Sequence, residues 1–88
     1  MWKIGLSKDA NKFIDKENIK DDELLVLAQK FINYSKGLEE NIDVKKLKGE
    51  WKGFHRIRTG KIRIILKGDF KEKSIFVDRI DFRGNVYK

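Results

Sequence analysis

Cysteine and proline are both absent from this 88-residue chain, and histidine occurs only once. Without cysteine there is no disulfide framework and no thiolate metal site, which suits a reducing compartment. Without proline, a proline-rich linker is excluded. No apolar run approaches the roughly 20 residues that a membrane span needs, and the first residues lack the charged and apolar regions of a signal peptide. We therefore expect one cytoplasmic domain, residues 1–88, with no membrane association.

The net positive charge comes from the second half of the chain. Residues 1–44 carry a net charge of −2, whereas residues 45–88 carry +9. All five arginines lie in the second half, at positions 56, 58, 63, 79 and 83. Because guanidinium groups bind phosphate oxygens through paired hydrogen bonds and stay charged, this polarity indicates a polyanionic partner. For the lysines alone, an ordinary solvated surface explains the charge equally well.

The chain begins with a pattern that predicts a strand followed by a short helix. Trp2, Ile4 and Leu6 alternate with Lys and Gly, as expected for a short strand with one apolar face. Ser7 is a suitable N-terminal cap for the helix, because its hydroxyl can accept a hydrogen bond from the first turn. We expect this helix to end near Asn18.

A second, longer helix is predicted after Asp21 or Asp22, either of which can cap it. Its apolar residues recur at helical spacing and form one stripe that can face a core. The stripe consists of Leu24, Leu27, Ala28, Phe31 and Ile32. Gly37 follows where a helix commonly ends in a left-handed residue.

The second half predicts strands. Residues 38–50 are interpreted as a charged connector, and strands follow at about 53–59, 61–68 and 74–81. A two-residue turn at Thr59-Gly60 joins the first two strands.

The third of these strands, near residues 74–77, is apolar on both faces and is expected to be interior. The order β-α-α-β-β-β predicts an α+β fold, in which two N-terminal helices form a hairpin packed on one face of a small, mostly antiparallel sheet.

Alternation assigns the hairpin side chains to two faces. If the hairpin isoleucines pack on the helices, Arg56, Arg58 and Arg63 emerge together on the opposite face. Neighbouring strands lie about 4.8 Å apart, so three guanidinium groups could surround one phosphate. We expect no acid to pair with them. Because unpaired like charges cost stability, the cluster favours a functional role.

Five side chains around the hairpin complete the list of candidates. Lys61 shares the face of the arginines, and Lys48 is either the rim of the cationic site or part of a solvated loop. Trp51 and Phe54 could stack on nucleobases beside a cationic groove, or could equally close one end of the core. His55 has the parity of the buried positions, so we expect a partly buried structural ring rather than a general base.

Three short motifs follow one another in the second half. They are Leu47-Lys48-Gly49, then His55–Arg58 with Gly60–Ile65, then Asp81–Tyr87. In this order they resemble the RelE/ParE superfamily of toxins from toxin–antitoxin systems. The resemblance implies a small α/β toxin. RelE-like members cut mRNA in the ribosomal A site, whereas ParE-like members inhibit DNA gyrase and lack the nuclease residues.

RelE-like chemistry, as the resemblance implies it, uses basic hairpin residues, an arginine on the following strand, a later arginine and a tyrosine near the end. Arg56, Arg58, Arg63, Arg83 and Tyr87 occupy those positions. The resemblance implies catalytic roles for Arg63, Arg83 and Tyr87, and phosphate binding for Arg56 and Arg58. Arginine stands where lysine is often found on the first hairpin strand. The acidic base and the tail histidine of some relatives have no counterpart here.

The resemblance therefore predicts a ribosome-dependent endoribonuclease. Its partners would be the ribosome, mRNA and a cognate antitoxin, and it would need no metal or small-molecule cofactor. Tyr87 is the expected base, since nearby guanidinium groups would favour its phenolate form. Two alternatives remain open: a ParE-like gyrase inhibitor without catalysis, and a basic RNA-binding module that does not cleave.

Overall fold

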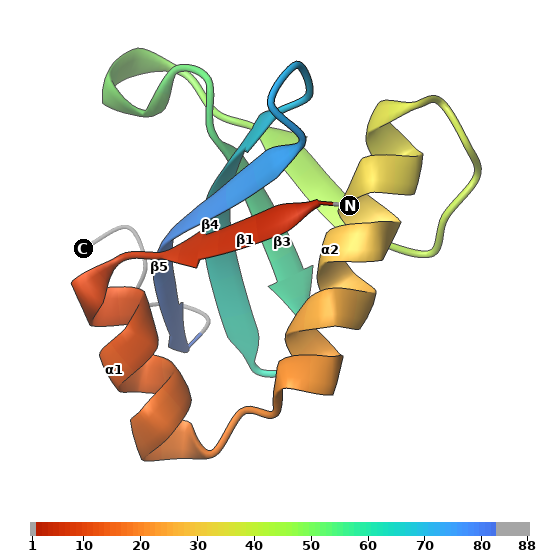
Figure 1. Ribbon diagram of the computed structural model, residues 1–88. Helices are drawn as coiled ribbons and strands as arrows, with labels where there is room; N and C mark the ends of the chain where they lie inside the picture. The colour runs from red at the N-terminus through yellow and green to blue at the C-terminus, as the bar shows by residue number, and fades with distance from the viewer. Residues whose placement is uncertain (1, 83–88) are drawn as a thin grey trace.

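The computed structural model describes residues 2–82 of the chain. Its elements are β1 (Lys3–Leu6), α1 (Lys8–Glu17), α2 (Asp21–Ser35), β2 (Asp43–Lys46), a 3-10 turn (Gly49–Trp51), β3 (His55–Thr59), β4 (Ile62–Asp69) and β5 (Ser74–Phe82). The five described strands form one sheet in the order β1-β5-β4-β3-β2. Only β1 and β5 pair in parallel. Both helices lie on one face of this sheet (Figure 1), which confirms the predicted fold class.

Helix α1 begins and ends where the sequence predicts. The Ser7 hydroxyl accepts a hydrogen bond from the Ala10 N–H at 3.0 Å and donates one to the Asp78 carbonyl at 2.5 Å. At the other end, Asn18 takes a left-handed conformation with φ 55°. Ser7 therefore caps the helix and also ties its first turn to β5.

Replacing Ser7 by alanine should lower the free energy of unfolding by about 0.5–2 kcal/mol, because one N-terminal N–H of α1 loses its acceptor. Urea unfolding followed by circular dichroism measures the change. Ser7→Thr retains the hydroxyl and should keep most of the stability. Equal losses in the two variants would show that the cap is not the source of the effect.

Helix α2 begins at Asp21, one or two residues earlier than the two predicted caps imply. Its N-cap is Lys20, which makes no side-chain capping hydrogen bond, so the prediction of an Asp21 or Asp22 cap is wrong. The two aspartates lie in the first turn instead. There they stabilise the helix through its dipole rather than as caps. Gly37 follows the helix with φ 83°, as predicted.

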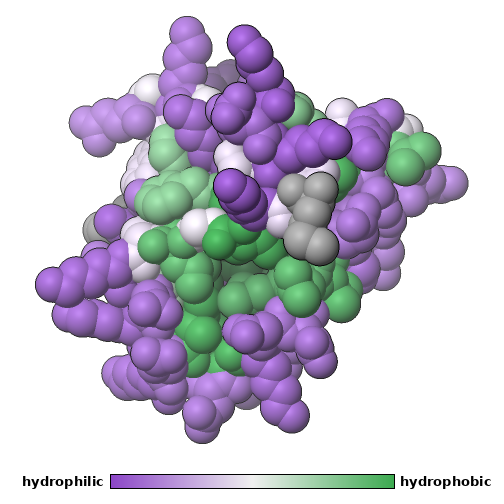
Figure 2. Space-filling model, in the orientation of Figure 1, coloured by the Kyte–Doolittle hydropathy of each residue, from purple (hydrophilic) through white to green (hydrophobic). Residues whose placement is uncertain are grey.

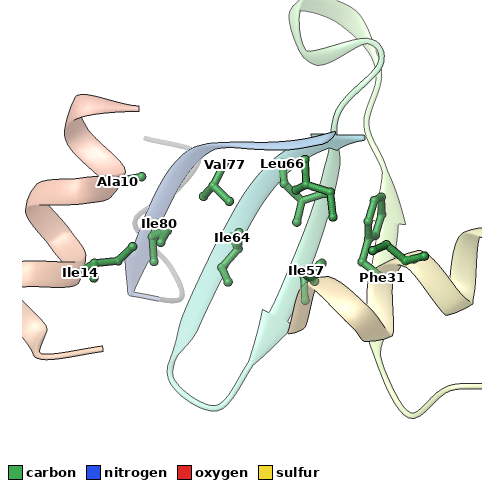
Figure 3. Packing of buried hydrophobic residues seen from close by; sticks show 11 residues of the cluster. Ala10, Ile14, Phe31, Ile57, Ile64, Leu66, Val77 and Ile80 are labelled. Carbon is green, nitrogen blue, oxygen red and sulfur yellow. The ribbon is translucent and has the colours of Figure 1, made fainter. Parts of the chain in front are cut away.

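The core lies between the helices and the sheet. Figure 3 shows Ala10 and Ile14 of α1 beside Ile80 at one side, and Phe31 of α2 near Ile57 at the other. The helices splay apart on this face (Figure 1), and apolar side chains gather between them (Figure 2). A groove of about 670 Å³ lies between α2, the β3–β4 turn and the end of β5.

The segment expected to be a connector contains an edge strand. β2 pairs antiparallel with β3, so that Asp43 lies opposite Arg58 and Val44 opposite Ile57. An edge strand is held by backbone hydrogen bonds to its one neighbour. The single apolar residue of β2 gives no alternation to detect. The interpretation of this segment as a plain connector is therefore wrong.

The hairpin turn is shifted by one residue from its predicted place. Thr59 pairs with Ile62 across the hairpin, so the two-residue loop is Gly60-Lys61 rather than Thr59-Gly60. Gly60 has φ 56°, which suits the first central position of a type II′ turn. Thr59 thus remains in the ladder of β3.

A β-bulge in β5 determines which side chains reach the face without helices. β5 lies between β1 and β4, as predicted, but only one of its faces is buried, because Phe76 is 42% exposed. The register with β4 shifts between Ile65 and Leu66, so that Asp78 has no opposite residue on β4. A bulge re-aims the residues that follow it. Arg79 thereby lies opposite Ile65, on the face without helices.

Candidate functional site

The face of the sheet that carries no helix holds the basic side chains. The register aligns two rows across β2, β3, β4 and β5. One row is Asp43, Arg58, Arg63 and Asp81; the next is Lys45, Arg56, Ile65 and Arg79. Arg56, Arg58 and Arg63 therefore share one face, as the alternation predicts.

An aspartate pairs with two of these arginines. Asp43 accepts a hydrogen bond from Arg56 Nη2 at 3.1 Å through Oδ1, and one from Arg58 Nε at 2.7 Å through Oδ2. The expectation that the arginines have no paired acid is wrong. It failed because the pairing depends on β2, which brings Asp43 next to residues 13 and 15 positions away.

Two of the three arginines line one basic pocket of about 360 Å³. Its lining consists of Lys45, Lys46, Leu47, Lys48, Arg56 and Arg63. Arg58 lies outside this lining and borders a neighbouring pocket with Asp43 and Lys30. The basic pocket thus joins Lys48 to two of the predicted arginines.

Lys61 is not part of the basic pocket. It lies in the hairpin turn and lines the apolar groove beside α2. Alternation along β4 would give Lys61 the face of Arg63, but β4 begins only at Ile62. A residue in a turn does not follow the alternation of the strand.

Trp51 and Phe54 lie on the cationic side of the sheet rather than in the core. Their rings meet edge to face at 5.4 Å. The Arg79 guanidinium lies 5.6 Å from the Trp51 ring centre, and Lys67 Nζ lies 5.8 Å from that of Phe54. Neither aromatic residue belongs to the core cluster. Sequence reasoning missed Arg79, because the place of this residue depends on the bulge.

His55 faces the helices, as its parity predicts. Its ring packs edge to face on Phe31, with 5.2 Å between ring centres. Burial lowers the pKa of His55 from its ordinary value of 6.5, and the nearby charge of Lys46 lowers the pKa further. The imidazole is therefore neutral at pH 7 and lies on the side of the sheet opposite the basic pocket.

The lowered pKa of His55 predicts acid sensitivity. The unfolded chain binds a proton near pH 6.5, whereas the folded protein resists it, so stability should fall as the pH drops below about 6.5. The loss should level off once the pH falls below the folded-state pKa. Thermal unfolding between pH 7.5 and 5 measures the effect. His55→Gln should flatten the profile in this range, and an unchanged profile would contradict the assignment.

Arg83 and Tyr87 lie outside the residues that the structure describes. Within residues 2–82, no group of three or more histidine, cysteine, aspartate and glutamate side chains is arranged to hold a metal ion. No helix in the same range is long and apolar enough to cross a membrane.

Solved structures share this architecture. A metal-bound toxin from Helicobacter pylori superimposes with a TM-score of 0.66 and 21% identity, over 98% of this chain and 99% of that one. The archaeal RelE–RelB complex from Pyrococcus horikoshii gives 0.62 and 22%, over 97% and 98% of the two chains. This chain has the RelE-type toxin fold.

A third structure with the RelE-type fold comes from Mycobacterium tuberculosis. It is the toxin–antitoxin complex RelBE2, with a TM-score of 0.58 and 19% identity over 93% of this chain and 98% of that one. At sequence identities of 19–22%, the structural similarity establishes the fold. No family model matches the sequence, and no curated protein matches it either.

Proposed function

We propose that this chain is the toxin of a toxin–antitoxin pair and cleaves mRNA in the ribosomal A site, which stops translation. One observation carries the proposal. In a RelE-type fold, Arg56 and Arg63 line the same basic pocket, on the sheet face that carries no helix. Three lysines line it with them. Such a pocket suits the closely spaced phosphates of single-stranded RNA. Because ribosomes are cytoplasmic, the protein would act there.

Cleavage of an RNA strand requires several groups to act together. The 2′-hydroxyl must attack in line with the leaving 5′-oxygen, a group must accept its proton, and the charge on the phosphate must be stabilised. We assign Arg63 and Arg83 to the scissile phosphate and the leaving oxygen, and Tyr87 to the proton. Arg56 and Arg58 would bind the flanking phosphates.

Among residues 2–82, the lining of the pocket has no group that is tuned to transfer protons near neutral pH. The residues that line it include no histidine and no carboxylate, and His55 faces the helices. Proton transfer is most efficient when the catalytic pKa lies near the working pH. We therefore propose that the free protein is a weak nuclease and that the ribosome fixes the RNA in a reactive geometry.

The rim of the pocket would bind the rest of the strand. Lys48 contributes to the pocket lining and would contact a phosphate. Trp51 and Phe54, which lie near Arg79 and Lys67, would provide surfaces for base stacking. Lys61, in the hairpin turn, would meet a phosphate farther along the strand.

The partner of the resting protein would be a cognate antitoxin. Two of the structures with the RelE-type fold are complexes, RelE–RelB and a toxin–antitoxin pair. A segment that covers the basic pocket would need to be acidic to complement the lysines and arginines that line it. We propose that such a segment blocks RNA access until the antitoxin is removed.

A cell-free translation reaction tests the proposal. The purified protein should stop synthesis, and primer extension on the recovered mRNA should reveal new 5′ ends within codons in the ribosomal A site. A parallel supercoiling assay with DNA gyrase should show no inhibition. Inhibited gyrase with intact mRNA would favour the ParE-like alternative. Salt-dependent RNA binding without cleavage would favour a binding module.

A further inference from the structure

Asp43 is a carboxylate that the structure ties directly to two of the proposed phosphate-binding arginines, Arg56 and Arg58. Its two oxygens are both used, one by Arg56 Nη2 and the other by Arg58 Nε. It comes from edge strand β2, directly opposite Arg58 in the register. The contact therefore fixes the two guanidinium groups relative to each other.

The three side chains of this contact differ in their exposure to solvent. The Arg56 side chain is only 10% exposed, that of Arg58 is 33% exposed, and that of Asp43 is 47% exposed. A buried guanidinium needs a partner, because an uncompensated buried charge is costly. Asp43 provides this partner to Arg56 Nη2 from the surface, where water and ligands also reach the carboxylate.

The geometry leaves donors for a ligand. A guanidinium has five N–H donors. Among the hydrogen bonds of residues 2–82, Arg58 uses Nε toward Asp43, which leaves its two terminal nitrogens for a ligand on a side chain that is one-third exposed. With Nε held, those nitrogens have a defined direction, as bidentate phosphate binding requires.

We propose that Asp43 is a positioning residue for RNA cleavage, which rests on the function proposed above. It orients Arg56 and Arg58 for the phosphates that flank the scissile bond. Its negative charge also weakens the local attraction for RNA. Asp43 thus raises the rate of cleavage at the expense of affinity, which a merely structural ion pair would not do.

The test separates affinity from rate. Asp43→Asn keeps the size of the side chain but removes its charge. Affinity for a short single-stranded RNA, measured by fluorescence anisotropy, should rise about two- to fivefold, as expected for one charge at a partly exposed pair. The rate of mRNA cleavage on saturating programmed ribosomes should fall about ten- to a hundredfold, because the guanidinium groups lose their orientation. Asp15→Asn, an exposed change of equal charge on α1, should alter neither quantity.

A second variant covers the case in which Asp43→Asn does not fold. Asp43→Glu keeps the charge but lengthens the arm, so RNA affinity should stay within about twofold while the rate falls. If RNA affinity, cleavage rate and melting temperature all fell together, the proposal would be overturned. An unchanged cleavage rate in both variants would overturn it as well.

One measurement tests Asp43 even if the protein cleaves no RNA. In NMR spectra of the free protein, the Arg58 Nε–H should exchange slowly with water and give a distinct signal, which Asp43→Asn should abolish. A persisting signal would overturn the positioning role. An absent cleavage activity with the expected NMR result would instead count against the proposed function alone.

Discussion

Arg63→Ala is expected to lower the rate of mRNA cleavage on the ribosome about 10²–10³-fold, the usual cost of removing one group that stabilises developing charge. Arg63 lies on central strand β4 and lines the basic pocket with Arg56. A strand at the centre of a sheet holds its side chains more rigidly than a loop does. Single-turnover cleavage on programmed ribosomes, followed by primer extension, measures the loss.

Two controls make the result on Arg63 specific. Arg63→Lys keeps the positive charge but not the planar fork, so its rate should lie between those of the wild type and Arg63→Ala. Lys71→Ala removes one charge from the exposed β4–β5 loop and should leave the rate within about threefold, because exposed charges far from a site have small effects. Melting temperatures of the three variants, compared with that of the wild type, show whether folding is affected. Equal activity of wild type and Arg63→Ala would remove Arg63 from the mechanism.

Phe31→Ala should destabilise the fold by about 3–5 kcal/mol, the range for deleting a buried phenylalanine ring. Phe31 is 1% exposed, and its ring packs against those of His55 and Phe70. Folded domains have only about 5–15 kcal/mol of stability in total. The variant should therefore unfold at much lower urea concentration, and part of it should be unfolded at 37 °C.

Leu25→Ala provides the matched control on the same helix. Leu25 is 56% exposed, so its truncation should change the stability by less than about 0.5 kcal/mol. Chemical unfolding of both variants by urea gives the comparison. Similar losses at the two positions would mean that Phe31 is not a centre of the core.

Where one face of an element is buried, the sequence was sufficient to predict it. The apolar stripe of α2 and the alternation of β3 and β4 each repeat over several residues, so the buried face is specified many times. Alternation likewise places Arg56 and Arg63 on one face and His55 on the other. These predictions depend only on local periodicity.

The remaining features depend on contacts between distant parts of the chain. β2 is held by its backbone pairing with β3, and its side chains carry no periodic signal. The pairing of Asp43 with Arg56 and Arg58 follows from that register, so it could not be predicted without predicting β2. The bulge at Asp78 likewise decides where Arg79 lies, and a bulge leaves no mark on hydrophobicity.

The proposed mRNA cleavage is tested most directly by mapping the cuts in a defined mRNA on stalled ribosomes. One reaction contains the purified protein and ribosomes with a chosen codon in the A site. The control reaction contains the protein and the same mRNA without ribosomes. We expect cleavage within the A-site codon, little cleavage of free mRNA, and a loss of about 10²–10³-fold with Arg63→Ala. Intact mRNA on the ribosome, or equal cleavage by wild type and Arg63→Ala, would contradict the proposal.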